Sequence, residues 1–199
     1  MIDVAGTFVT IFVTLFVAEL SDKDALLLLA LATRNKVLTV FLAGSTAFIL
    51  TTIVNVTVGS IAVELIDVKW IKLGGGAVMI AYAAWEARGI IGGKIIEEEE
   101  HRLEKSHDGV RTFLLMVGTL ALLDLAGDAT MILTIVLVAH YPNDLILVFV
   151  ATCAGLIAAT GVETALGNRL GKYLTPRRVR FVSVVIFLVL GSLIALTAF

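Results

Sequence analysis

The chain has 199 residues, of which 59% are hydrophobic and 16% are charged, and its mean hydropathy is +1.01. A water-soluble domain of this length has too little interior to hide so much apolar surface, so most of the chain is expected to face lipid. The formal net charge of −2 excludes the basic surface that nucleic acids require, and the single cysteine excludes a disulfide framework. The composition therefore predicts an all-α, polytopic membrane protein in a lipid bilayer.

Six apolar blocks follow one another along the chain, each long enough for a spanning helix of about 20 residues. They cover residues 4–34, 37–63, 70–92, 112–141, 145–168 and 179–198. Both prolines, Pro142 and Pro176, fall in polar breaks between blocks, where they do not interrupt a helix. The first block is expected to be retained, because the residues before it lack the basic segment of a cleavable signal peptide.

The break at residues 93–111 differs from the others, because it carries dense charge of both signs. We interpret it as a solvated linker between two three-helix halves, residues 1–92 and 112–199. Lysines and arginines lie mainly in this linker and in the loops after the first and fifth blocks, whereas the opposite loops carry only Lys69 and Lys72. The positive-inside rule therefore predicts that the linker is cytoplasmic and that both termini lie outside.

The two halves share an internal repeat. Residues 40–43 read VFLA and residues 148–151 read VFVA, and the same spacing aligns Asn55 with Glu163. With three spans in each half, the second copy enters the membrane from the opposite side. The sequence thus predicts two inverted three-helix repeats, with a site near the middle of the bilayer where the copies meet.

Acidic residues interrupt the first and fourth blocks near their middles. Glu19 and Asp22 lie in the first block, and Asp124 and Asp128 lie in the fourth. An ionisable group at the centre of a spanning helix costs about 2.5–3.5 kcal/mol, so these side chains are expected to face one another or a cavity. Spacings of three and four residues place each pair on one face of a helix. Four converging carboxylates would need a cation or protons to offset their repulsion.

Oxygen ligands of this kind suit Ca²⁺, Mn²⁺ or Mg²⁺, and the absence of His and Cys beside the acids argues against zinc and copper. The predicted metal ligands are Glu19, Asp22, Asp124 and Asp128. Additional candidates for the ion path or a proton relay are Ser21, Lys23, Asp24, Asn55, Gly127, Thr130 and Glu163. Two structural alternatives remain open: Lys23 neutralises Asp22 while the other acids bond to helix ends, and Glu163 pairs with Arg169.

Residues 19–24, Glu-Leu-Ser-Asp-Lys-Asp, resemble the motif Glu-x-Gly-Asp-(Lys/Arg)-(Ser/Thr), which occurs twice in uncharacterised protein family 0016. This family comprises cation:proton exchangers that include calcium/manganese transporters of the Golgi and chloroplast. In the second copy Gly127, Asp128 and Thr130 match the motif. Leu125 replaces the motif glutamate, and Asp124, one turn before Asp128, is a candidate for the missing carboxylate.

The resulting hypothesis is a secondary antiporter, not an enzyme, that exchanges Mn²⁺ or Ca²⁺ for protons by alternating access. The metal ion is the transported substrate, and no resident cofactor is expected. A membrane-embedded hydrolase is disfavoured, because His101 and His107 lie in the linker and His140 lies at the end of a block. An exporter of small organic or amino-acid substrates and an uncoupled cation channel remain alternatives. The sequence leaves the ion, the stoichiometry and homo-oligomerisation open.

Overall fold

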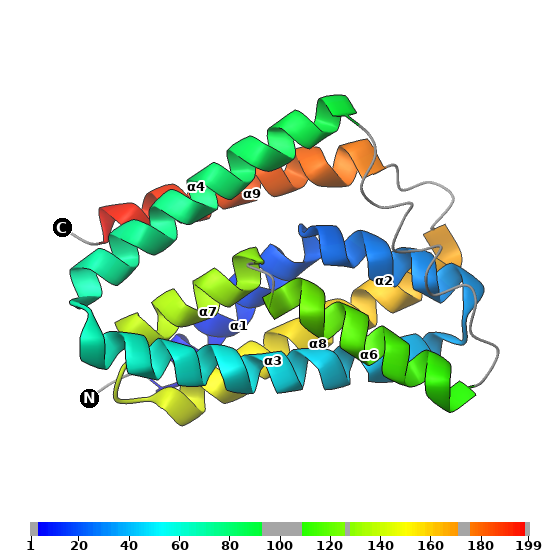
Figure 1. Ribbon diagram of the computed structural model, residues 1–199, viewed down its shortest axis with the longest axis horizontal. Helices are drawn as coiled ribbons and strands as arrows, with labels where there is room; N and C mark the ends of the chain where they lie inside the picture. The colour runs from blue at the N-terminus through cyan, green and yellow to red at the C-terminus, as the bar shows by residue number, and fades with distance from the viewer. Residues whose placement is uncertain (1–3, 93–108, 126–127, 171–175, 198–199) are drawn as a thin grey trace.

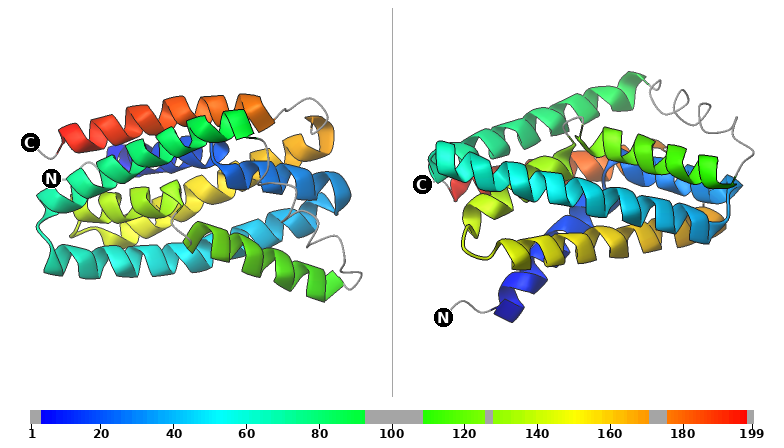
Figure 2. Two further views of the ribbon diagram at one scale, coloured as in Figure 1. Left: turned by 45° about the horizontal axis from the view of Figure 1, so that its top comes forward. Right: turned by 60° about the horizontal axis from the view of Figure 1, so that its bottom comes forward.

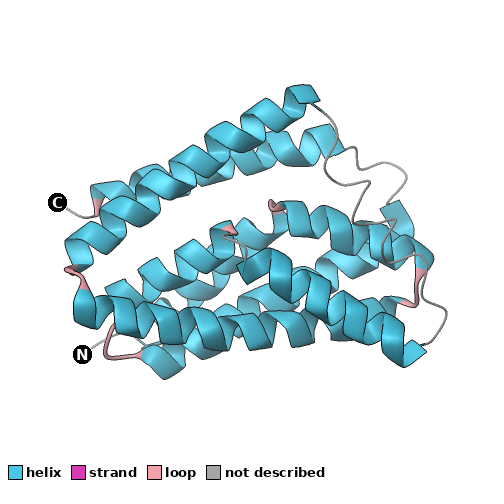
Figure 3. Cartoon of the chain, in the orientation of Figure 1, coloured by secondary structure: helices cyan, strands magenta, loops and turns pink. Residues whose placement is uncertain are grey.

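A computed structural model describes residues 4–92, 109–125, 128–170 and 176–197. Every regular element in these ranges is an α-helix and none is a strand, as Figure 3 shows, which confirms the all-α prediction. The helices are α1 (Val4–Leu20), α2 (Lys23–Arg34), α3 (Val37–Leu65), α4 (Val68–Gly92), α6 (Gly109–Leu125), α7 (Ala129–His140), α8 (Leu145–Leu170) and α9 (Pro176–Leu196).

The helix boundaries follow the polar breaks of the sequence. The side chain of Asp67 accepts a hydrogen bond of 2.8 Å from the backbone N–H of Lys69, and this cap starts α4. Two boundaries differ from the prediction. Helix α6 begins at Gly109, so the last three residues of the predicted linker are helical, and the rest of the linker lies outside the described residues. Pro176 is the first residue of α9, a position where its missing N–H leaves no helix bond unmade.

The first and fourth apolar blocks each form two helices instead of the single helix that the spacing of their acids assumes. Helix α1 gives way to α2 at Ser21 and Asp22, and α6 and α7 meet at an angle of 60°. Asp128 has an extended backbone (φ −66°, ψ 156°) directly before α7. Ser and Asp side chains compete with helical backbone hydrogen bonds, which favours a break at such residues. The predicted acids therefore lie at helix ends, not along an uninterrupted helix face.

Two of the described helices are long and apolar enough to span a membrane, residues 37–65 and 145–167. The bent pair α6 and α7 makes a third span if it crosses as one unit, and α1 and residues 184–196 are shorter apolar helices. These helices are consistent with an integral membrane protein, and the count does not reach the predicted six spans.

The helices of the two halves pack against one another (Figures 1 and 2). Helices α1 and α2 pack on α8, and helices α6 and α7 pack on α3, while α3 also contacts α8. Helices α4 and α9 lie side by side as a separate pair, which contacts the other helices mainly through α4 and α7. The start of α1 and the end of α9 lie at one end of the molecule, whereas the start of α6 lies at the opposite end and α4 runs toward that end.

Glycines allow the closest helix contacts. A Cβ atom on Gly76 of α4 would lie 2.7 Å from the carbonyl oxygen of Gly191 in α9, and one on Gly191 would lie 2.9 Å from the carbonyl oxygen of Gly76. Only residues without a side chain permit the two backbones to approach so closely. Gly76 belongs to a run of three glycines, and its neighbour Gly74 has open space around it. Close helix packing therefore depends on particular positions of this run.

Candidate ion-binding site

Three carboxylates from the broken helices are buried in the centre of the molecule. Asp22 follows α1, Asp124 is the penultimate residue of α6, and Asp128 directly precedes α7. Their exposed fractions are 1%, 0% and 0%. Apolar side chains such as Leu15 and Leu133 belong to the same core. Charged groups at such positions need polar neighbours, because burial without them is unfavourable.

Tyr82 of α4 connects the acids of the two halves. Its hydroxyl donates a hydrogen bond of 2.7 Å to Oδ1 of Asp22 and lies 3.5 Å from Oδ1 of Asp128. The Tyr82 side chain is only 7% exposed. One phenol oxygen therefore lies between a carboxylate of the first half and a carboxylate of the second.

Thr130 and Asn55 complete the polar network on the side of α6 and α7. The hydroxyl of Thr130 lies 3.0 Å from Oδ1 of Asp124 and 2.9 Å from Oδ2 of Asp128. The amide of Asn55 in α3 donates a long hydrogen bond of 3.4 Å to Oδ2 of Asp124. Among the described residues, the Oδ1 atom of Asn55 is buried and accepts no hydrogen bond. We call these six residues the carboxylate cluster: Asp22, Asn55, Tyr82, Asp124, Asp128 and Thr130.

The helix ends add a fixed electrostatic field to the cluster. Asp22 and Asp128 directly precede the N-terminal ends of α2 and α7, where the helix dipole stabilises negative charge. The C-terminal ends of α1 and α6, whose carbonyl groups favour cations, lie at the same two breaks. A broken helix of this kind brings cation-attracting carbonyl ends and stabilised carboxylates to one place.

The other residues predicted for the site are not among the six residues of the cluster, and some of them lie outside the described residues. The hydroxyl of Ser21 donates to the carbonyl oxygen of Val17 at 2.8 Å, so it serves its own helix. Glu19 and Glu163 are buried, at 0% and 2% exposure, on α1 and α8, which pack together. Gly127 and the side chains of Lys23, Asp24 and Arg169 lie outside the described residues, so neither structural alternative is tested.

Among the described residues, no three His, Cys, Asp or Glu side chains group closely enough to surround one metal ion. In the cluster, hydroxyl groups stand between the carboxylates: Tyr82 between Asp22 and Asp128, and Thr130 between Asp124 and Asp128. The geometry thus offers oxygen atoms of the type that Ca²⁺ and Mn²⁺ prefer, although the carboxylates must approach one another to share an ion.

Sequence reasoning missed Tyr82. A single tyrosine in an apolar helix carries no local signal that distinguishes a buried hydroxyl donor from a residue at the membrane interface. Only the packing of α4 against α7 and α9 places it at the helix breaks.

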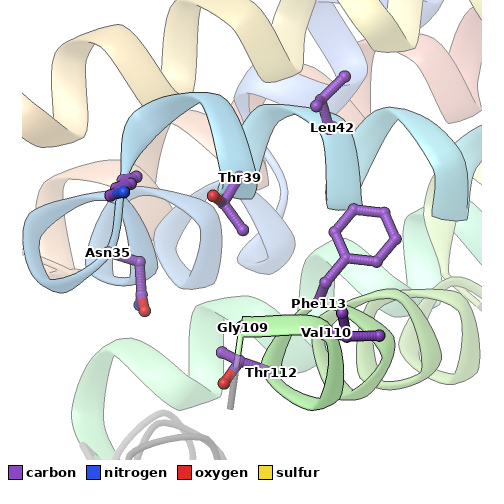
Figure 4. Close-up of a pocket in the computed structure, with 8 residues that line it drawn as sticks. Asn35, Thr39, Leu42, Gly109, Val110, Thr112 and Phe113 are labelled. Carbon is purple, nitrogen blue, oxygen red and sulfur yellow. The ribbon is translucent and has the colours of Figure 1, made fainter. Parts of the chain in front are cut away.

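A pocket of about 520 Å³ lies at the end of the molecule where α3 and α6 begin (Figure 4). Residues of the α2–α3 connection and of the first turns of α3 and α6 line it, including Asn35, Thr39, Thr112 and Phe113. None of the lining residues belongs to the cluster. The pocket lies beside the contact between α3 and α6. The same two helices carry Asn55 and Asp124 closer to their C-terminal ends.

Apolar helices that break at buried carboxylates are typical of membrane transporters for cations. A comparison with protein families matches residues 7–92 and 112–199 to the model described as "Divalent cation/proton antiporter GDT1". The chain belongs to this family, which confirms the resemblance drawn from residues 19–24. The family consists of transporters and not enzymes, and its transported species are divalent cations and protons. No match was found among curated proteins or among solved structures.

Proposed function

We propose that this protein exchanges Mn²⁺ or Ca²⁺ for protons at the carboxylate cluster. The observation that carries this proposal is the meeting of three buried aspartates through two hydroxyl groups in an apolar core. Like charges this close are stable only with a counter-ion or with protons on some of them. Metal ions and protons would therefore compete for the same oxygen atoms, which is the chemical requirement for exchange.

We propose that Asp22, Asp124 and Asp128 are the principal cation ligands, with Glu19 one turn before Asp22 as a fourth carboxylate. Asn55 is a suitable neutral ligand, since its buried Oδ1 atom accepts no hydrogen bond from the described residues and its amide lies 3.4 Å from Asp124. Thr130 can add a hydroxyl oxygen. This set consists of hard oxygen donors, which favours Ca²⁺ and Mn²⁺ over zinc or copper.

We propose that the chain consists of two inverted repeats of three spans, residues 1–92 and 112–199, which rock to give alternating access. Two observations support the repeat. Each broken helix pair packs on the long helix of the other half, α1 and α2 on α8 and α6 and α7 on α3. The two halves also begin at opposite ends of the molecule (Figure 1). The six spans would be α1 with α2, α3, α4, α6 with α7, α8 and α9.

The proposed orientation has both termini outside and the charged linker in the cytoplasm. The excess of lysine and arginine in the linker and in the loops at the same end supports it. The single cysteine, Cys153, is buried, so a cysteine added at Ser106 in a Cys153→Ala background can be labelled selectively. A membrane-impermeant maleimide should react with that cysteine in inside-out vesicles and not in right-side-out vesicles; the reverse pattern would contradict the orientation.

The function is tested by cation uptake into proteoliposomes under an imposed pH gradient. The wild-type protein should take up Mn²⁺ or Ca²⁺ against its gradient, and Asp22→Asn and Asp128→Asn should each lower the initial rate at least about tenfold, since each removes a ligand charge. Glu64→Gln is the matched control, because Glu64 is exposed at the far end of α3. An uptake rate that does not depend on the pH gradient would indicate a channel. Unchanged uptake in both Asp22→Asn and Asp128→Asn would exclude the cluster as the transport site.

A further inference from the structure

The Tyr82 ring packs edge-on against two aromatic side chains. It lies edge-on to Trp85 at 5.9 Å and 73°, and edge-on to Phe187 of α9 at 5.3 Å and 80° between ring centroids and planes. Phe187 is fully buried. Edge-to-face contacts of this kind fix the direction of the ring. The α4 and α9 pair therefore presents one oriented hydroxyl to the breaks of both halves.

The Tyr82 hydroxyl is within reach of carboxylates from both halves. The phenol oxygen lies 2.7 Å from Oδ1 of Asp22 and 3.5 Å from Oδ1 of Asp128. A phenol has a single hydrogen, so it can donate fully to only one of them, and the shorter distance identifies Asp22 as the acceptor. A metal ion shared by Asp22 and Asp128 would compete with this hydroxyl for the Oδ1 atoms of both residues.

We propose that Tyr82 is a latch: when no cation is bound, its hydroxyl occupies the position between Asp22 and Asp128 and stabilises the site, and a divalent cation must displace it to bind. The latch rests on the proposed function of the cluster. It weakens cation binding, because the bond from Tyr82 to Asp22 must be broken first. It also speeds release, because the hydroxyl returns to Asp22 as the ion leaves. Tyr82 is thus a positioning residue that keeps affinity low enough for turnover.

Loss of the latch should change Kd and KM in the opposite direction from general damage to the site. Tyr82→Phe keeps the ring against Trp85 and Phe187 and removes only the hydroxyl. It should lower the Kd for Mn²⁺ about tenfold, equal to about 1.4 kcal/mol at 25 °C. In transport, KM should fall and kcat should fall with it, since ion release becomes slower. A damaged site would instead raise KM while kcat falls.

The experiment is Mn²⁺ binding to the purified full-length chain, followed by the electron paramagnetic resonance signal of free Mn²⁺, together with the transport kinetics. Tyr141→Phe is the matched control, because it removes a phenol hydroxyl at the end of α7, outside the cluster. A second variant, Phe187→Leu, leaves the hydroxyl in place but loosens the ring, and it should lower the Kd in the same direction by a smaller factor.

An unchanged or increased Kd in Tyr82→Phe, with Tyr141→Phe equal to wild type, would overturn the latch while leaving the proposed function intact. Wild-type protein that binds Mn²⁺ but shows no transport driven by a pH gradient would overturn the proposed function. In that case the ratio of the Kd values of Tyr82→Phe and wild type would still show whether the Tyr82 hydroxyl competes with the cation. Failure of the wild-type protein to bind Mn²⁺ or Ca²⁺ would overturn both.

Discussion

Thr130 brings one hydroxyl group within 3.0 Å of Asp124 and within 2.9 Å of Asp128. A single hydroxyl hydrogen cannot serve two carboxylates equally, so a proton on one of the acids would complete the network. At the scale of single residues, this shared hydroxyl is the feature from which we propose that the cluster takes up protons as well as metal ions. The Oδ1 atom of Asn55 is buried and accepts no hydrogen bond from the described residues, while its amide lies 3.4 Å from Oδ2 of Asp124.

Thr130→Val should lower the rate of exchange at least about tenfold, because it removes the bridging oxygen and leaves two buried carboxylates without their shared donor. The measurement is the initial rate of Mn²⁺ uptake into proteoliposomes. Thr134→Val is the control: the hydroxyl of Thr134, one turn further along α7, donates to the backbone carbonyl oxygen of Thr130 and, within the described ranges, to no carboxylate. Equal rates in the two variants would show that the Thr130 hydroxyl has no part in the site.

The residues of the site were predictable to different degrees. Asp22, Asp124 and Asp128 stand out in the sequence because charged groups in apolar blocks are costly and rare, and the structure places them in one cluster. Asn55 and Thr130 were foreseen through the repeat and the motif. Tyr82 was not, because its role depends on the packing of α4 and not on its neighbours in sequence. Ser21 was expected on the ion path; its hydroxyl donates to the carbonyl oxygen of Val17, and its place on the path stays a prediction.

At the scale of helices, the outer boundaries of the apolar blocks were predictable and the interior breaks were not. The polar break at Asp67 marks a helix end directly, since the Asp67 side chain caps α4. The breaks between α1 and α2 and between α6 and α7 lie inside the blocks 4–34 and 112–141, which are longer than the roughly 20 residues of one spanning helix. Mean hydropathy alone treats each of these blocks as one helix and does not locate the break. The breaks matter for function, because they place Asp22 and Asp128 at helix ends in the core.

The α4 and α9 pair depends on the close approach at Gly76 and Gly191. Gly76→Ala should destabilise the protein by about 1–3 kcal/mol, because the new Cβ atom would lie 2.7 Å from the carbonyl oxygen of Gly191 and 2.9 Å from Cβ of Ala195. The measurement is the thermal unfolding temperature of the detergent-solubilised protein. Gly74→Ala, in the same run of glycines but with nothing within 4 Å, should be as stable as wild type or slightly more stable. Equal unfolding temperatures for the two variants would contradict the close contact.

At the scale of the whole molecule, the site exists only because the two halves meet. Asp22 belongs to the first half and Asp124 and Asp128 to the second, and the hydroxyl of Tyr82 connects them. The two halves share one core, because the broken pair of each half packs on the long helix of the other half. A rocking motion of one half against the other would therefore change the distances between the carboxylates. In the proposed mechanism, this change links ion binding to opening of the site on one side of the membrane or the other.

An anomalous diffraction map from crystals of the full chain soaked in Mn²⁺ would locate the bound ion directly. We expect a manganese peak between the two broken helices, bound by carboxylate oxygens of both Asp22 and Asp128. A peak bound only by residues of one half, or manganese sites confined to the surface of the protein with none at the cluster, would contradict it.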